Sequence, residues 1–443
     1  MFTASGCEKF VEAGIPKNEL VADAVFTDDK TAISAMDGIY SRMMTDGFAS
    51  GFYNSISVCA GLTADELIGY GAEQLYFYQN SILPSSSNIS VGLWKQPYSL
   101  IYTTNSILEG LASTNGISNE VKTQLRGEAL FVRSFIYFYL VNLYNDIPFY
   151  TKTDYQANIA AGKTAKADVL KHIEEDLLEA KALLSADFIV EDRVRPNKYI
   201  VAALLARLYL YNGEWDKAIT ESTFVLNNAG VYEIETDISR VFLADSKETI
   251  WHLIPVLPNT NTNEANIFTL TDIPSFVSLD PALAHFFEQQ DLRRTQWIDS
   301  IVVGTDVFFY PKKYKVLAGE GPVTEYEVVL RLAEQLLIRA EANANLNHLS
   351  EAEADINILR SRAGVSPING LAQNELLGAI ATERRLELFT EWGHRWFDLI
   401  RTNQATAVLS QNPEKSWQET DIYFPIAQEE INANPQVDQN HGY

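Results

Sequence analysis

The chain is 443 residues long, 47% hydrophobic and 21% charged, so it can build a sizeable core in one large domain or in two to three ordinary ones. Its formal net charge of −24 repels nucleic acids, other polyanions and anionic lipid surfaces and argues against them as partners, which leaves neutral or cationic ligands. No apolar run reaches the ~18–20 residues of a membrane helix, so the sequence predicts no membrane-spanning segment.

The sequence contains two cysteines, Cys7 and Cys59. One interpretation is that both are free thiols. The alternative starts from Ala4-Ser5-Gly6, small residues directly before Cys7, as at the end of a bacterial lipoprotein signal, where the cysteine becomes the lipidated first residue. Only six residues precede Cys7, so we expect them to be the remnant of a longer signal. Cys59 would then have no partner, and we predict no disulfide.

The first predicted helix covers residues 28–46, where apolar side chains recur on one face. Residues 47–93 differ, because glycines and aromatic side chains are scattered through them and a polar run occupies 84–88. Long loops in compact domains are often functional, so we treat this segment as a candidate ligand-binding region. Helical periodicity returns at Trp94, is strongest over 119–144, and reappears in an acidic amphipathic helix at 165–184.

An internal repeat follows these helices. Residues 206–218 align without a gap on residues 340–352, and each segment predicts a helix, a turn and a second helix. Gly213 and Asn347 take the same position, and both residue types tolerate the left-handed turn after a helix. The pattern resembles tetratricopeptide units. Two units are fewer than the ~3 that a stable solenoid needs, so we expect residues 119–184 to stack with them.

Residues 245–323 lack helical periodicity. A short strand is predicted at 248–253, a polar loop at 259–266 and a short helix at 281–289. We treat this segment as the second region of loops.

Residues 381–402 mix charges with tryptophans as no other stretch does. Four arginines face four carboxylates there, and charges take helical positions that would ordinarily be apolar. Packed charges must be paired, so we predict a buried structural network in which His394 donates to a carboxylate and Gly393 separates two helical pieces. Its predicted members are Arg384, Glu387, Glu391, His394, Arg395 and Asp398.

The run Glu383-Arg384-Arg385-Leu386-Glu387-Leu388, continued by Glu391-x-Gly393-His394-Arg395-Trp396-Phe397-Asp398-Leu399, resembles the C-terminal signature of the SusD/RagB family, nutrient-binding surface lipoproteins of Bacteroidetes. Trp392 departs from the family pattern, which usually places Glu directly before Gly. Other segments match the family in the same order, from Cys7 to Tyr443, and include Trp94-x3-Tyr98-x2-Ile101-x3-Asn105, residues 127–133, 140–148, 308–314 and 424–443.

The resemblance implies a mostly α fold, a tetratricopeptide-like helical-repeat platform with long irregular loops and a few short strands. Residues 1–27 would hold the lipid-anchor cysteine Cys7, a tether and an extended segment. Residues 28–443 would form a single SusD-like domain. Its helical-repeat core would lie at about 94–232 and 324–402, and its ligand-binding loops at about 47–93 and 245–323.

Motifs for catalysis or metal binding are not found in the sequence. The six histidines form no paired metal spacing, and Gly162-Lys163-Thr164 lacks the glycine that a phosphate-binding loop would need at Ala157. A glycoside hydrolase needs two carboxylates ~5–9.5 Å apart in a sugar cleft. Glu383, Glu387 and Glu391 are poor candidates, because neighbouring arginines would keep them ionised. We predict no enzymatic activity, no cofactor and no metal.

Sugars pack their apolar C–H faces on aromatic rings, while amide and charged side chains satisfy the hydroxyls. Two clusters in the predicted loops have this composition, although the same aromatic residues can equally cover the helical platform. The first consists of Tyr70, Tyr76, Tyr78, Gln79 and Asn80, and the second of Arg293, Arg294, Gln296 and Trp297. The predicted ligand contacts are Tyr70, Tyr76, Tyr78, Asn80, Arg293 and Trp297.

The resemblance also implies a function. The protein would bind an oligosaccharide or polysaccharide at the surface of the outer membrane and deliver it to a SusC-type TonB-dependent transporter without breaking a bond. Three alternatives stay open: a RagB-like member that captures peptides, a tetratricopeptide-like scaffold that binds a folded protein, and a hydrolase.

Overall fold

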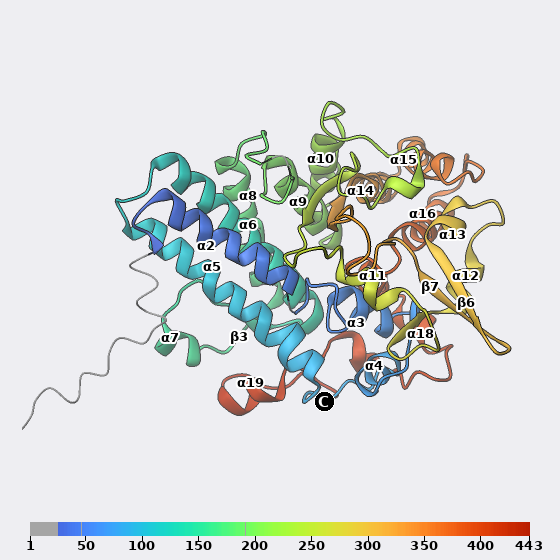
Figure 1. Cartoon of the computed structure of the whole chain (residues 1–443), viewed down its shortest axis with the longest axis horizontal. Helices are drawn as coiled ribbons and strands as arrows, with labels where there is room; N and C mark the ends of the chain where they lie inside the picture. Colours follow the sequence, from blue (N-terminus) through green and yellow to red (C-terminus); the bar gives the residue numbers. More distant parts are fainter. Residues whose placement is uncertain (1–24, 46, 191) are drawn as a thin grey trace, which may run out of the picture.

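The computed structural model describes residues 25–45, 47–190 and 192–443 (Figure 1). The predicted lipid-anchor residue Cys7 and its tether lie outside these residues. Within them, no helix is both long enough and apolar enough to cross a membrane. Most of the regular structure is helical and the strands are short, as the sequence predicted.

Four long helices form one end of the molecule (Figure 1). They are α2 (Asp29–Thr45), α5 (Gln96–Ser113), α6 (Asn119–Tyr144) and α8 (Lys166–Leu183), close to the predicted bounds. A π-helical segment, Asn88–Lys95, runs directly into α5, so helical structure begins before Trp94. Helix α6 is capped by Ser118, whose hydroxyl accepts a hydrogen bond from the Val121 amide.

The two predicted repeats are helical hairpins. One consists of α9 (Lys198–Tyr211) and α10 (Trp215–Leu226), the other of α14 (Leu332–Asn345) and α15 (Leu349–Arg362). Gly213 and Asn347 both adopt left-handed backbone conformations, with φ of +71° and +61°, which confirms the predicted turns.

The repeats stack as expected on the helices that precede them. Helix α8 packs between α6 and α9, α10 packs on α14, and α16 (Gln373–Leu388) covers α14 and α15. A buried ion pair, Arg207 Nε to Glu334 Oε1 at 2.6 Å, joins the first helices of the two repeats. Each of these two buried charges therefore has its partner on the other repeat.

Strands occur in three small antiparallel sheets. The largest has the order β1-β5-β7-β6 and contains β1 (Leu67–Gly69), β5 (Val277–Leu279), β7 (Asp306–Pro311) and β6 (Ile298–Val303). The predicted strand near 248–253 is β4 (Thr249–Leu253), which pairs with β8 (Glu327–Arg331). The third sheet joins β2 (Ile147–Pro148) to β3 (Lys163–Thr164).

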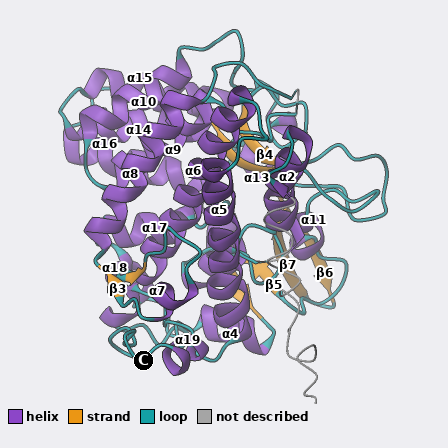
Figure 2. Ribbon diagram, turned by 90° about the vertical axis from the view of Figure 1, so that its left-hand side faces the viewer, coloured by secondary structure: helices purple, strands orange, loops and turns teal. Residues whose placement is uncertain are grey.

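Short helices complete the fold between these elements. Figure 2 shows the helices of the repeats gathered on one side and strands β5, β6 and β7 on the other. The short helices are α3 (Ile56–Thr63), α4 (Ala72–Tyr78), α7 (Tyr155–Ile159), η3 (Ile238–Arg240), α11 (Asn263–Phe268), α12 (Pro281–Phe286), α13 (Leu292–Gln296), α17 (His394–Arg401), α18 (Ala405–Leu409), η4 (Glu419–Ile422) and α19 (Gln428–Ala433).

The left-handed turn of the second repeat gives a first prediction. Asn347 is exposed, and valine at this position would have to adopt a conformation that costs a β-branched residue about 1–2 kcal/mol. We expect Asn347→Val to lower the free energy of unfolding by about that amount, measured by urea denaturation. Asn347→Gly is the control and should be neutral or slightly stabilising. Equal stability of the two variants would contradict the role assigned to this turn.

Candidate functional site: an aromatic face on the four-stranded sheet

The four-stranded sheet has one face rich in aromatic side chains. In the pairing register Ile68 lies opposite Ser278, and Leu279, the next residue of β5, lies opposite Phe309 of β7. Residues at alternate positions share a face, so Tyr70, Phe276 and Phe308 lie on the same side of the sheet. The Tyr70 hydroxyl lies 2.9 Å from Ser278 Oγ, and the Tyr70 and Phe308 rings meet edge to face at 6.5 Å.

An exposed tyrosine from another segment extends this face. Tyr53 stacks on Phe276 with ring centroids 6.3 Å apart and planes 15° apart, although the two residues are far apart in sequence. Tyr53 is 43% exposed and Phe276 47% exposed. We call Tyr53, Tyr70, Phe276 and Phe308 the aromatic face. Exposed rings held side by side are the surface on which the C–H face of a sugar packs, and an apolar patch of this kind commonly marks a binding site.

The backbone around Tyr53 is held in place by polar contacts. The Asn263 amide group donates to the carbonyls of Met44 and Ser50, at 3.1 and 2.7 Å. Gly51 has φ +72°, and a Cβ there would lie 3.0 Å from Glu264 Cγ. Only glycine fits this close approach without strain. The segment that carries Tyr53 thus packs against α11.

Two buried carboxyl groups lie beneath that segment. Glu264 and Glu327 are hydrogen-bonded to each other and almost fully buried. Burial raises the pKa of Glu264 to about 8, and the nearby Glu391 carboxylate adds to the shift. Burial and the neighbouring Glu264 raise the pKa of Glu327 well above its ordinary value. At neutral pH the pair therefore retains protons, because two adjacent buried carboxylates cannot both ionise cheaply.

The first predicted ligand cluster is only partly available to a ligand. Tyr70 belongs to the aromatic face, and Tyr76 on α4 is half-buried. The predictions for Tyr78 and Asn80 are corrected. These side chains are only 5% and 4% exposed, and their hydrogen bonds hold parts of the protein together. Tyr78 donates to Glu414 at 2.5 Å, and the Asn80 amide group donates to the Thr63 carbonyl at 3.1 Å.

Two residues of the second predicted cluster, Trp297 and Arg293, are wrong as ligand contacts. Trp297 and Arg293 are fully buried, so a ligand at the surface does not reach them. Trp297 donates to the Ile238 carbonyl at 3.1 Å, and its ring lies beneath the Lys313 ammonium at 4.9 Å. Arg293 is bound to the carboxylates of Asp291 and Glu383. Both residues therefore belong to the charged core.

Sequence reasoning missed Tyr53, Phe276 and Phe308 as members of one surface. Alternation in Ile68-x-Tyr70, Phe276-x-Ser278 and Phe308-x-Tyr310 was the available signal. Strands as short as β1 and β5 leave too few alternations to recognise, and their pairing joins segments about 200 residues apart.

A balanced network of buried charges occupies the centre of the protein. The Glu387 carboxylate accepts from Arg331 at 2.6 Å, from Arg362 at 2.5 Å and from Arg293 at 3.1 Å. We call the following the core ion network, in which five buried cations face five buried carboxylates: Arg293, Lys313, Arg331, Arg360 and Arg362 with Glu248, Asp291, Glu383, Glu387 and Glu391.

The partners of these carboxylates were not predicted. Within 381–402 the predicted pairing is found only in part: Arg384 pairs with Asp398 at 2.9 Å, whereas Arg395 pairs with Asp65 at 2.7 Å. Burial alone would raise the pKa of Glu387, but Arg362, Arg331 and Arg293 together hold it below its ordinary value. The carboxylate is consequently ionised at neutral pH and is no general acid.

The prediction for His394 was wrong. No hydrogen bond joins its ring to a carboxylate among the described residues, and its Nδ1 has no partner there. Burial, followed by the surrounding cations Arg207, Arg384, Arg331 and Lys313, lowers its pKa well below the ordinary value. His394 is thus a neutral, packed residue. Gly393 does mark the predicted helix break, with φ +73° directly before α17.

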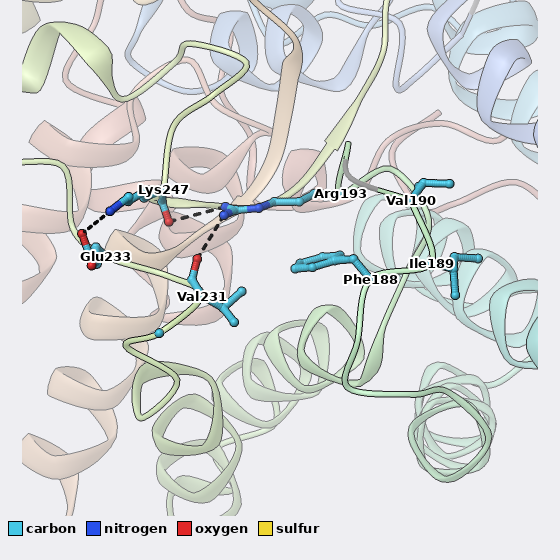
Figure 3. A pocket seen from close by; sticks show the side chains of 8 residues that line it. Phe188, Ile189, Val190, Arg193, Val231, Glu233 and Lys247 are labelled. Atoms are coloured by element: carbon cyan, nitrogen blue, oxygen red, sulfur yellow. Dashed lines mark hydrogen bonds and ion pairs between the residues drawn. The ribbon is translucent and has the colours of Figure 1, made fainter.

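A separate hollow of about 640 Å³ lies between Phe188, Val190 and Val231 (Figure 3). Its charged side chains are already paired. Arg193 donates to the carbonyls of Val231, Ser246, Lys247 and Thr249, and Lys247 pairs with Glu233 at 3.0 Å. The Arg193 guanidinium therefore holds the surrounding loops together, and few of its hydrogen-bond donors remain for a ligand.

Across the described ranges, no three His, Cys, Asp or Glu side chains are grouped so that they could hold a metal ion. The fold and the surface place this protein in the class of mostly helical repeat proteins. It presents a small sheet with an exposed aromatic face. An arrangement of this kind is suited to binding a ring-shaped or extended ligand at the surface.

Comparisons with known proteins agree with this class. A family model described as "Starch-binding associating with outer membrane" matches residues 38–210, and one described as "SusD family" matches residues 299–443. SusD-like protein P2 of Formosa agariphila is 26% identical over 100% of this chain and 98% of its own. The chain belongs to the SusD/RagB family.

Solved structures show the same fold. A SusD superfamily protein from Bacteroides vulgatus has a TM-score of 0.82 at 21% identity and covers 94% of this chain and 99% of its own. Surface glycan-binding protein A from Bacteroides fluxus has a TM-score of 0.79 at 22% identity, with 94% and 99% covered.

The core ion network gives a stability prediction. We expect Glu387→Gln and Arg331→Ala each to lower the free energy of unfolding by about 3–5 kcal/mol, because each removes a shared partner from several buried charges. Arg126→Ala is the control: it breaks an exposed pair with Glu179 and should cost about 1 kcal/mol or less. Chemical denaturation measures all three. Ligand affinity of the folded variants should equal that of the parent, and lost affinity with unchanged stability would contradict a structural role.

The carboxyl pair gives a pH prediction. Folded Glu264 keeps its proton up to about pH 8, whereas the unfolded residue loses it near pH 4.5, so stability falls as the pH rises through this window. Glu264→Gln remains neutral. We expect its melting temperature to match that of the parent near pH 4.5 and to exceed it by several degrees at pH 8. The control is exposed Glu351→Gln. A difference that does not change with pH would contradict the assignment.

Proposed function

We propose that the protein binds an oligosaccharide or polysaccharide on its aromatic face at the cell surface and delivers it to a SusC-type TonB-dependent transporter, without cleaving it. A lipid on Cys7 would hold it at the outer membrane. The observation that carries the proposal is the stacked pair of Tyr53 and Phe276, two exposed rings from distant segments held beside Tyr70 and Phe308.

Several findings support a carbohydrate as the ligand. One matching family model is described by starch binding and association with the outer membrane, and one structural neighbour is named for surface glycan binding. Neutral sugars also suit a chain with a net charge of −24, since they meet no electrostatic repulsion. The open sheet surface favours an extended chain of sugar rings over a small enclosed ligand.

Burial of the carboxylates supports a role without catalysis. Glu383, Glu387 and Glu391 were the carboxylates weighed as hydrolase candidates, and all three are buried in the core ion network. A glycosidase needs its two carboxyl groups on either side of a bound sugar. The aromatic face itself consists of Tyr and Phe side chains.

Binding at the aromatic face is tested by single alanine variants. We expect Tyr53→Ala and Phe276→Ala each to weaken binding of a panel-selected oligosaccharide roughly tenfold, because each removes about 1–2 kcal/mol of ring contact. Calorimetry measures the affinity, and Tyr155→Ala, an exposed tyrosine on the distant helix α7, is the control. Unchanged binding in both variants would remove this site. Capture of peptides in place of glycans would move the function to peptide uptake.

Delivery to a transporter is tested separately by purification from the native membrane in mild detergent. Co-purification with a TonB-dependent outer-membrane protein would support the delivery step. Release of the protein as a free monomer would contradict it.

A further inference from the structure

A cavity of about 790 Å³ lies at the turn end of the first repeat, and none of its lining residues belongs to the aromatic face. It is bounded by the turn between α9 and α10, by α14, and by α16 and α17, with one side chain from α12. Ligand pockets commonly measure ~300–1,000 Å³ and sit on rigid elements. Helices supply most of this wall, so its side chains are held in fixed positions.

Arginines dominate the charges around the cavity. Arg384, Arg385, Arg395 and Arg401 line it, together with the carboxylates of Glu341 and Asp398. Arg401 is bound to both carboxylates, at 2.5 and 2.7 Å, and Arg384 pairs with Asp398.

Arg385 and Arg395 share one further carboxylate. Asp65 lies 2.8 Å from Arg385 and 2.7 Å from Arg395. Four guanidinium groups are thus paired with three carboxylates, those of Glu341, Asp398 and Asp65, and the carboxyl groups of Glu66 and Asp280 also lie close enough to act on Arg385.

Several guanidinium N–H groups have no acceptor. Arg384 is 2% exposed, and its Nη1 has no hydrogen-bond partner among the described residues. The same holds for Nε of Arg385. Both of these nitrogens are enclosed by protein, so a molecule in the cavity does not reach them. Arg385 binds Asp65 through Nη2, and Arg395 binds it through Nε and Nη2, so Nη1 of each arginine has no acceptor among the described residues. These two groups are available to a ligand.

Apolar surface surrounds these donors. The Arg385 guanidinium stacks over Phe286 at 5.1 Å, and Arg401 over Tyr211 at 5.4 Å. Trp215 and Leu377 also line the cavity. Stacked guanidinium groups keep a fixed plane, and a planar fork of donors matches the two oxygens of a carboxylate.

We propose that this cavity is a second ligand site, which takes a small molecule bearing a carboxylate. The carboxylate binds the free Nη1 groups of Arg385 and Arg395, and the body of the ligand packs on Phe286, Trp215 and Leu377. A uronate unit of a sugar and a free organic acid share this chemistry. The inference stands apart from the proposed function, since the cavity and the aromatic face share no residue.

A matched pair of sugars tests the proposal. D-glucuronate and D-glucose differ by the carboxylate alone. We expect calorimetry on the full chain to show D-glucuronate binding at least about tenfold tighter than D-glucose, with an affinity that falls as salt is added. Benzoate is the organic-acid arm. Binding of benzoate supports the site and assigns it to organic acids in general, whereas binding of glucuronate without benzoate supports it and assigns it to uronates.

A rim variant locates the binding. Thr382 is exposed at the cavity, and Thr382→Glu adds a carboxylate that competes for the arginines. We expect it to weaken carboxylate binding at least about tenfold. Asn374→Glu adds the same charge to an exposed position of α16 outside the cavity and should leave the affinity unchanged. The proposal is overturned if neither carboxylate binds, if glucose binds as tightly as glucuronate, or if Thr382→Glu behaves like Asn374→Glu.

Discussion

The mutual neutralisation of the core ion network is the interaction on which the rest of the structure depends. Five buried cations and five buried carboxylates are tolerable only together, since a single unpaired buried charge costs several kcal/mol. Its members come from β8, α13, α15, α16 and the loops between them, so the network forms only when segments from 248 to 391 have come together. It thereby fixes the repeat helices against the part of the chain that carries the sheet.

Local sequence predicted the elements but not their long-range partners. The helical hairpins followed from periodicity, and their turns from Gly213 and Asn347, because these signals act within a few residues. Charges at apolar positions of α16 indicated burial, yet the arginines that bind Glu387 are distant in sequence and were not predicted. Trp297 illustrates the same limit: an aromatic residue beside arginines reads as a sugar site, and its burial depends on contacts with Lys313 and Ile238.

The helical platform presents two surfaces of different chemistry. The aromatic face offers neutral rings on a thin sheet, backed by the protonated Glu264–Glu327 pair, and suits uncharged sugars. The cavity at the turn end of the first repeat offers arginines between apolar walls and suits an anion. Both surfaces border the segment from Asp65 to Tyr70, since Asp65 binds Arg395 and Tyr70 belongs to the aromatic face. The residues of the SusD/RagB signature include the buried charges. Neither Tyr53 nor Phe276, the stacked pair, belongs to the signature.

The most direct measurement is a crystal structure of the protein with an oligosaccharide selected on a glycan panel. We predict density for sugar rings packed on Tyr53 and Phe276, with Tyr70 and Phe308 beside them and the core ion network unchanged. A glycan bound elsewhere, with the Tyr53 and Phe276 rings bare, would contradict the assignment of the aromatic face as the binding site.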